Sequence, residues 1–256
     1  MQIRLPGHLA RDYKSASQQA RVVTEAWGCD NFYCLNCPSP RLEPTPRGTE
    51  AIDYRCPRCD SPYQLKGQSR PLGGRINDAA YDAMLRAIRS ANTPNLLALQ
   101  YDRSEWLVRN LILIPHFVFT QSAIQKRKAL SASARRHGHI LCNIVLANLP
   151  QQARVPLIVE GVALKPRAAR ELYNKLRPLE RVRLEARGWT LDVLNAVQKL
   201  GKQDFTLAEA YGFAEELGRL HPRNRHVEPK IRQQLQRLRD FGFLQFLSPG
   251  NYRLKS

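Results

Sequence analysis

Four cysteines constrain the fold of this 256-residue chain more than any other feature of its sequence. They form two Cys-x-x-Cys pairs, Cys34 with Cys37 and Cys56 with Cys59, and eighteen residues separate the pairs. This spacing is typical of a structural zinc site, because each pair places two thiolates on one tight turn. The alternatives are two disulfides or four buried thiols. A four-cysteine zinc site is closed, so we expect the metal to stabilise the fold and to take no part in catalysis.

The compartment of the chain bears on the choice between zinc and disulfides. The first seven residues contain no apolar core of the kind found in signal peptides. The aliphatic run at 111–114 is far shorter than the ~20 apolar residues that span a bilayer. We therefore expect a soluble protein of the cytoplasm, where disulfides are rare. The remaining cysteines, Cys29 and Cys142, are predicted to be buried thiols.

The net charge indicates a polyanionic partner. The chain has 40 Lys and Arg residues against 22 Asp and Glu residues, which gives a formal net charge of +18. Contacts between basic side chains and phosphates release counterions, so a chain of this charge is suited to binding nucleic acid. A membrane surface is the alternative partner, but the sequence has no strongly amphipathic basic helix with an aromatic face. We expect a nucleic-acid-binding protein with no membrane partner.

Hydrophobic periodicity predicts an α+β domain over residues 1–182. Residues 28–62 are rich in Cys, Pro and Gly and are expected to be irregular, and residues 116–150 have no clear period. A helical stretch is predicted to end at Arg177-Pro178. The other predicted helices cover 8–27 and 76–90, and the predicted strands cover 51–54, 63–66, 95–101, 106–115 and 155–159. This order of elements predicts a mixed sheet.

A different pattern follows a polar boundary near residues 178–188 and defines a second domain over 183–256. The first helix is expected to follow Trp189, and Thr206 with Glu209 forms a capping box that opens a helix reaching Leu220. The third helix is predicted over 229–240. Strands over 243–247 and 252–254 are then joined by a turn that contains Pro249 and Gly250. Three helices followed by a hairpin predict a winged helix-turn-helix domain.

The third helix of this domain is a candidate reader of DNA bases. Its apolar residues recur at helical spacing: Val227, Ile231, Leu235 and Leu238. The candidate DNA-contacting residues of this helix are Lys230, Arg232, Gln233, Gln236 and Arg237. Gln and Arg are the side chains that read adenine and guanine in the major groove. A solvated polar face is the alternative explanation of the same pattern.

A possible nuclease site lies around the second cysteine pair. Asp53 is followed, after ten residues, by Gln64-Leu65-Lys66, a spacing typical of metal-dependent phosphodiesterases. Gln64 and Lys66 lie on the same side of a strand, and Asp53 would meet them across a hairpin whose turn is the second cysteine pair. Asp53 would hold Mg²⁺, and Lys66 would orient or deprotonate a water molecule. Glu25 could add a carboxylate. The alternatives are a solvated Asp and Lys on an edge hairpin, and a surface Glu25.

Two basic clusters in the first domain are suited to phosphate contacts. They are Lys126-Arg127-Lys128 and Arg135-Arg136. Solvated charge is again the alternative. His137 and His139 follow the second cluster, but two histidines with no carboxylate nearby form a poor ligand set for a metal.

With these residues identified, the chain resembles the DpnI-like family of methyl-directed restriction endonucleases over nearly its whole length. The zinc pattern and the block 230–235 are the most specific parts of the resemblance. The shared motifs are Tyr13-Lys-Ser, Thr24-Glu25, Tyr33-Cys34-x-x-Cys37, Cys56-x-x-Cys59, Leu65-Lys66, Ile76-Asn-Asp78, Ala134-Arg-Arg136, Cys142-Asn-Ile144, Arg187-Gly-Trp-Thr190, Phe205-Thr-Leu207 and Lys230-Ile-Arg-Gln-Gln-Leu235.

The resemblance implies a PD-(D/E)xK restriction-endonuclease-like domain with an inserted zinc ribbon, followed by a winged-helix domain. It further implies Mg²⁺-dependent hydrolysis of double-stranded DNA at GATC sites that carry N6-methyladenine. In that family both domains sense the methylated site, so Arg135, Arg136 and His139 are candidate DNA contacts in the first domain. We expect the protein to act as a monomer.

The sequence departs from the family pattern at two positions. Gln64 replaces the acidic residue before Leu65-Lys66, and an amide oxygen can coordinate Mg²⁺ without carrying a full negative charge. His139 replaces the aromatic residue that touches the methylated base. Two other functions therefore stay open: a non-cleaving reader of methylated DNA, and a zinc-ribbon transcription regulator.

The zinc hypothesis predicts the effect of Cys56→Ser. Removal of one thiolate should release the metal and destabilise the first domain, because binding of a structural metal contributes directly to the free energy of folding. Metal content and the thermal unfolding of the purified variant measure both effects. A wild-type protein without zinc, together with an unchanged melting temperature in the variant, would contradict the hypothesis.

Overall fold

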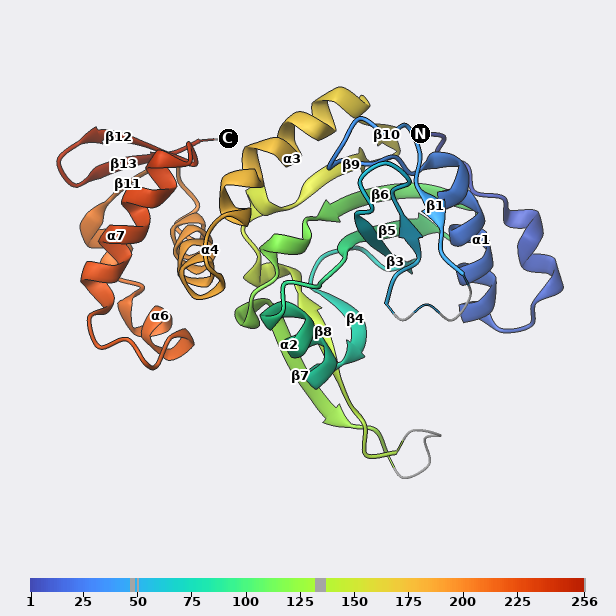
Figure 1. Ribbon diagram of the computed structural model, residues 1–256, viewed down its shortest axis with the longest axis horizontal. Coiled ribbons are helices and arrows are strands. Elements are labelled where there is room, and N and C mark those ends of the chain that lie inside the picture. Colours follow the sequence, from blue (N-terminus) through green and yellow to red (C-terminus); the bar gives the residue numbers. More distant parts are fainter. Residues whose placement is uncertain (47–48, 50, 132–136, 256) are drawn as a thin grey trace.

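The computed structural model describes residues 1–46, 49, 51–131 and 137–255, and it has the mixed α+β architecture that the sequence predicts. Figure 1 shows a central sheet with helices around it, and a separate group of helices and short strands formed by the C-terminal residues. Among the described residues, no helix combines the length and the apolar character needed to cross a membrane.

A seven-stranded sheet, counted over the described residues, forms the centre of the N-terminal part, with the order β1-β2-β3-β5-β6-β9-β10. Its strands are β1 (Glu43–Pro44), β2 (Tyr54–Arg55), β3 (Pro62–Gln68), β5 (Asn95–Asp102), β6 (Leu107–Ile114), β9 (Val155–Val159) and β10 (Val162–Ala163). Strand β3 runs parallel to β5, with Lys66 opposite Ala98, and β5 pairs with β6 in the antiparallel sense. Residues 96–99 of β5 are at most 1% exposed, which explains their continuous apolar run.

Helices cover this sheet and a second sheet packs beside it. Helix α1 (Ala16–Asn31) packs on β3, and α3 (Pro166–Glu180) packs on β9. The second sheet consists of β4 (Arg75–Ala80), β8 (Ile140–Val145) and β7 (Ile124–Ala129), and α2 (Tyr81–Arg89) packs against it. The short helical turns are η1 (Gly7–Asp12), η2 (His116–Val118), η3 (Gln121–Ala123), η4 (Leu146–Asn148) and η5 (Gln151–Ala153).

The helix predicted over 76–90 is wrong in its first part, because residues 75–80 form β4. Ile76 pairs with Ile144 of β8, and both side chains are buried. The pairing of β4 with β8 shifts register between Asn77 and Ala80, and that of β7 with β8 shifts between Lys126 and Ala129. Each shift interrupts the two-residue alternation of a strand, so neither β4 nor the region 116–150 has a clear period in the sequence.

The first predicted helix, over 8–27, is also wrong in its bounds. Residues 7–12 form the turn η1, and Tyr13 then has an extended backbone. Helix α1 begins at Ala16, because Ser15 caps it by accepting a hydrogen bond from the Gln18 amide at 3.2 Å. The strand predicted over 51–54 is reduced to its last residue, since Ala51 has a φ of 57° and lies in a turn.

The C-terminal part has the arrangement of a winged helix-turn-helix. It contains α4 (Leu184–Gln198), α5 (Leu207–Tyr211), α6 (Ala214–Leu220) and α7 (Val227–Asp240). Strands β12 (Leu244–Ser248) and β13 (Asn251–Leu254) form the predicted hairpin, with Gly250 at a φ of 77° in its turn. Strand β11 (Asp204–Thr206), which the sequence did not predict, pairs with β13.

Three boundaries near and within this part differ from the predictions. Helix α3 continues past Pro178 to Glu180, since Pro178 lies in its last turn. Helix α4 starts at Leu184 instead of following Trp189, and it buries Arg187 within the stretch that was predicted as a polar boundary. The capping box of Thr206 and Glu209 is confirmed, but α5 ends at Tyr211 and α6 forms a separate helix.

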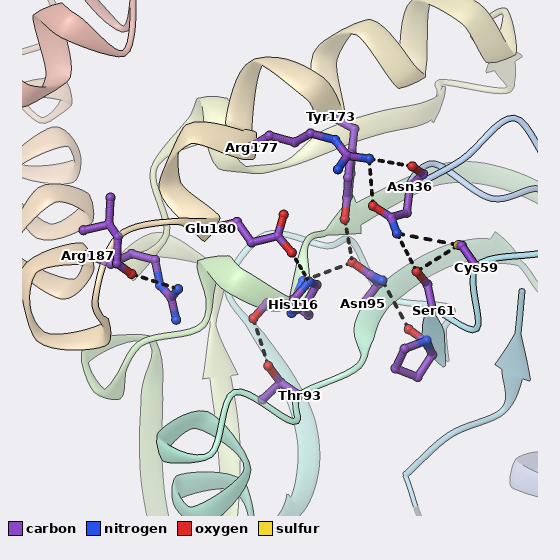
Figure 2. A network of polar contacts seen from close by, with 12 residues as sticks. Asn36, Cys59, Ser61, Thr93, Asn95, His116, Tyr173, Arg177, Glu180 and Arg187 are labelled. Carbon is purple, nitrogen blue, oxygen red and sulfur yellow. Dashed lines mark hydrogen bonds and ion pairs between the residues drawn. The ribbon is translucent and has the colours of Figure 1, made fainter.

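Polar contacts join α4 to the turn η3 and the end of α3 to the turn η2. The Ser122 hydroxyl donates to Asp192 Oδ1 of α4 at 2.6 Å, and Asp192 Oδ2 lies 2.8 Å from His221 Nε2. Beside them, His116 Nε2 of η2 lies 3.3 Å from Glu180 Oε1 at the end of α3 (Figure 2). Thr93 and Asn95 hold the backbone of His116 from the strand side. These contacts fix the end of α3 against the sheet.

His116 should make stability depend on pH. Burial lowers the pKa of its imidazole, attraction to Glu180 opposes this shift, and repulsion from Arg187 adds to it. The unfolded chain therefore binds a proton more readily than the folded chain, and the free energy of unfolding should fall as the pH drops below about 6.5. We expect His116→Gln to reduce the loss of stability between about pH 7.5 and about pH 5, as measured by urea unfolding. A larger loss in the variant than in the wild type would contradict this assignment.

Candidate metal centre and active site

The two cysteine pairs converge on one point. Cys34 Sγ lies 3.6 Å from Cys59 Sγ, Cys37 Sγ lies 3.5 Å from Cys56 Sγ, and all four sulfur atoms lie within 4.8 Å of one another. Tetrahedral thiolate ligands at about 2.3 Å from zinc would be about 3.8 Å apart. These separations fit a shared metal and are too long for disulfides, whose sulfur atoms are about 2.05 Å apart. The four cysteines therefore form a site able to bind a structural metal.

Local backbone turns place the four thiols. The first pair follows α1, and the second occupies the loop between β2 and β3. In that loop the Cys56 amide donates to Ser61 O at 3.0 Å, and the Asp60 amide donates to Cys56 O at 2.9 Å. Asp60 has a φ of 58°, a conformation that Asp tolerates better than most residues. The β2–β3 hairpin thus closes around the second pair.

Hydrogen-bond donors surround the sulfur atoms. The Cys37 amide donates to Cys34 Sγ at 3.3 Å, and the Tyr63 hydroxyl lies 3.3 Å from the same sulfur. Burial opposes ionisation of Cys59, yet hydrogen bonds from the Ser61 side chain and backbone lower the pKa of this thiol to about 6. Such donors orient thiolate ligands and stabilise their negative charge.

Helix α3 braces the first cysteine pair from outside. Arg170 Nε donates to Cys34 O at 2.9 Å, and its Nη2 donates to Ser39 O at 3.0 Å. About two turns further along the helix, Arg177 Nη2 donates to Asn36 Oδ1 at 2.8 Å (Figure 2). Asn36 Nδ2 in turn lies 3.6 Å from Cys59 Sγ. The metal-binding loop is therefore tied to a helix that is distant in sequence.

The β2–β3 hairpin also brings Asp53 to β3. The Asp53 amide donates to Tyr63 O at 2.9 Å, and Asp53 Oδ2 accepts from the Leu65 amide at 2.7 Å. This hydrogen bond places the carboxylate beside the backbone between Gln64 and Lys66.

The two faces of β3 have different neighbours. A Cβ at Gly67 would lie 3.3 Å from Thr24 Cγ2, so the face that carries Gly67 packs on α1. Side chains alternate along a strand, so Gln64 and Lys66 lie on the opposite face. There Lys66 Nζ lies 3.0 Å from Asp78 Oδ1 of β4. Asp78 belongs to the motif Ile76-Asn-Asp78, but the sequence alone did not indicate a role for it.

Glu25 lies on the α1 side of the hairpin. Its carboxylate accepts from Arg21 Nη1 at 2.9 Å, and its carbonyl oxygen accepts from the Tyr54 hydroxyl at 2.7 Å. Glu25 and Asp53 both line a pocket of about 540 Å³ between α1 and residues 44–46, 49 and 52–54. Over the described residues, that lining does not include Gln64 or Lys66. Asp53 thus lies beside Glu25 in this pocket and beside the backbone of β3 between Gln64 and Lys66. Glu25 and Lys66 themselves lie on different sides of β3.

The leftover cysteines differ from each other. Cys142 of β8 is buried, as predicted. Cys29 is exposed, so the prediction of a buried thiol is wrong there. It lies in the last turn of α1, one residue beyond the buried positions Trp27 and Gly28.

Helix α7 has the two faces that its sequence predicts. Ile231, Leu235 and Leu238 are fully buried, whereas Arg232, Gln233 and Gln236 are exposed. Lys230 is half-buried, and His139 at the start of β8 is exposed. Arg135 and Arg136 lie outside the described residues.

Gln234 is a buried polar residue that the sequence analysis missed. Its Oε1 accepts from the Thr190 hydroxyl at 2.8 Å and from Arg237 Nη1 at 3.0 Å. Gln234 thus joins α7 to α4. Its hydrogen bond with Arg237 also keeps the half-buried Arg237 side chain close to the surface of α7. Its spacing of three from Ile231 was the signal for a buried position.

The contacts of α3 with the metal-binding loop predict that removal of Arg170 speeds the loss of bound metal. Arg170→Ala removes the hydrogen bonds to Cys34 O and Ser39 O in the loop of the first cysteine pair, so a chelator should extract bound zinc more easily, with affinity reduced by roughly 10- to 100-fold. Arg167→Ala is the matched control, since the Arg167 side chain is 91% exposed and pairs with Glu171 on the same helix. Equal zinc release by both variants and the wild type would contradict a role of Arg170 at the site.

The comparison with protein families covers the chain in two parts. Residues 1–182 match the DpnI family model, described as the Dam-replacing family. Residues 185–254 match the model of the C-terminal DpnI domain, described as the Dam-replacing HTH domain. Together these matches include the metal site, the β2–β3 hairpin and helix α7. The chain therefore belongs to the DpnI family, a family of methyl-directed restriction endonucleases with a helix-turn-helix domain.

Proposed function

We propose that this protein is a Mg²⁺-dependent type II restriction endonuclease with a PD-(D/E)xK nuclease domain over 1–182 and a winged-helix domain over 183–256. It hydrolyses both strands of double-stranded DNA at GATC sites that contain N6-methyladenine. The observation that carries the proposal is the hydrogen bond of 2.7 Å from the Leu65 amide to Asp53, which holds the carboxylate next to Gln64-Leu65-Lys66. Family membership and the net charge of +18 support it.

In this proposal Asp53 and the amide oxygen of Gln64 hold Mg²⁺. Bound Mg²⁺ supplies a Lewis acid for the phosphate oxygen and lowers the pKa of a water molecule. Lys66 carries a positive charge on the same face of β3 as Gln64 and stabilises the negative charge that develops on the phosphate. Glu25 approaches Asp53 from the α1 side and adds a second carboxylate to the neighbourhood. The four cysteines hold zinc, which fixes the hairpin and takes no part in the reaction.

Both domains contact DNA in this proposal. In GATC the two adenines occupy adjacent base steps on opposite strands, so two methyl groups lie close together in the major groove. The exposed Gln233 and Gln236 of α7 face outward and suit bidentate contacts with adenine. Lys230, Arg232 and Arg237 supply phosphate contacts beside them. Arg135, Arg136 and His139 form the second reading surface, and one monomer carries both.

A second candidate is a non-cleaving reader of methylated DNA. Gln64 favours it, because a neutral amide binds Mg²⁺ more weakly than a carboxylate does. The two functions differ in one observable: only the nuclease breaks phosphodiester bonds when Mg²⁺ is added.

Cleavage of a methylated GATC duplex across a Mg²⁺ titration tests the proposal. Asp53→Asn should abolish cleavage and leave DNA binding largely intact, since it keeps the acceptor for the Leu65 amide and removes the metal-binding charge. Lys66→Ala should have nearly the same effect. Gln64→Glu should lower the Mg²⁺ concentration needed for half-maximal cleavage, because it adds a charge to the metal site.

The matched control is Asp60→Asn, in the same hairpin. The Asp60 side chain is 79% exposed and pairs with Arg55, so its replacement should leave cleavage unchanged. Cleavage by Asp53→Asn at the wild-type rate would place the active site elsewhere. Methyl-selective binding without cleavage by the wild type would establish the reader instead.

A further inference from the structure

A buried carboxylate lies against the proposed catalytic lysine. The Asp78 side chain is 2% exposed, the Lys66 side chain is 28% exposed, and Lys66 Nζ lies 3.0 Å from Asp78 Oδ1. Asp78 belongs to β4 in the second sheet, whereas Lys66 belongs to β3 in the central sheet. The ion pair therefore connects the two sheets at the face of β3 that carries Gln64.

The backbone of β4 directs Asp78 to this place. The pairing of β4 with β8 is regular at Ile76 and Asn77 and shifts register before Ala80, so Asp78 lies at the irregularity. Irregularities of this kind break the alternation of a strand and redirect a side chain. They are common beside active sites.

Among the described residues, Lys66 is the cation that forms an ion pair with Asp78. Cys142 of β8 is buried. Burial is the main cause that raises the pKa of its thiol to about 11, and the negative charge of Asp78 adds to this increase. Cys142 is therefore neutral near pH 7. Lys66 and Arg127 oppose that shift with their positive charges. Of these two cations, Lys66 forms the ion pair.

A lysine ammonium sits on a flexible stem, so its position depends on its partner. A buried carboxylate needs a nearby cation, because removal from water disfavours an unpaired charge. Asp78 and Lys66 thus fix each other. The negative charge of Asp78 also offsets part of the repulsion between Lys66, which stays protonated, and a divalent cation held by Asp53 and the neutral Gln64.

We propose that Asp78 is a positioning residue of the nuclease site: it fixes the Lys66 ammonium through the ion pair and offsets its positive charge on the face of β3 that carries the neutral Gln64. This inference rests on the proposed nuclease function. It assigns a role in cleavage to a residue of the second sheet, outside the sequence Asp53-x10-Gln64-x-Lys66.

Single-turnover cleavage of a methylated GATC duplex by the full chain tests the inference. Asp78→Asn keeps the shape of the side chain and removes its charge. We expect the cleavage rate to fall by roughly 100-fold, the effect of about 1 Å of misplacement in an active site. DNA affinity should stay close to that of the wild type, and the Mg²⁺ concentration for half-maximal cleavage should rise.

A double variant separates positioning from a structural role. Gln64→Glu combined with Asp78→Asn places a new carboxylate on the same face of β3 as Lys66, so it should recover part of the lost rate. The effect of Gln64→Glu alone is the reference: if Asp78 acts with Gln64 at the site, Gln64→Glu should raise the rate by a larger factor in Asp78→Asn than in the wild type, whereas a structural defect at β4 would give the same factor in both. Asp102→Asn is the control, since Asp102 pairs with Arg109 at the end of β5, and it should cleave like the wild type.

The outcomes distinguish the two proposals. If the wild type does not cleave, the proposed function and this inference both fail. If the wild type cleaves and a folded Asp78→Asn cleaves equally fast, the inference alone is overturned. Thermal unfolding and DNA binding show whether Asp78→Asn is folded. If it is not, Asp78→Glu is measured instead: it keeps the charge and displaces it, so an unchanged cleavage rate with this variant would overturn the inference.

Discussion

The convergence of four cysteine thiols determines how the rest of the N-terminal part is organised. Strands β1 and β2 have two residues each, too few to hold a hairpin against the sheet by backbone pairing alone. A metal shared by the two cysteine pairs would join the segment after α1 to the loop between β2 and β3. Asp53 directly precedes β2, so the same closure sets the position of its carboxylate relative to β3. Folding and the proposed chemistry thus depend on one metal site.

Strand β3 is where the remaining parts of the site meet. Its Gly67 face accepts α1, and its Gln64 and Lys66 face meets Asp78 from the second sheet. The charges around it are arranged in pairs: Glu25 with Arg21, and Lys66 with Asp78. Asp53 differs, because it accepts from a backbone amide. Among the described residues no basic side chain forms an ion pair with Asp53, so its charge is available to a metal ion, and we assign it the central role.

Local sequence signals were sufficient where they were strong and continuous. The cysteine spacing predicted the four-cysteine cluster. Local patterns also predicted the apolar strands β5, β6 and β9, the capping box at Thr206 and the apolar face of α7. The prediction failed where tertiary pairing overrides the local pattern. The shift of register in β4 hides a strand inside an apparent helix, and with it the location of Asp78. The buried Gln234 was missed because its partner Thr190 lies on another helix.

The central claim is that this fold cuts DNA only where adenine is methylated. The most direct measurement is digestion of one plasmid, prepared from an adenine-methylating host and from a non-methylating host, by the purified wild-type chain with Mg²⁺. The account predicts that the methylated plasmid is cut into fragments that end at GATC sites, while the unmethylated plasmid stays intact. Equal cutting of both plasmids, or cutting of neither, would contradict it.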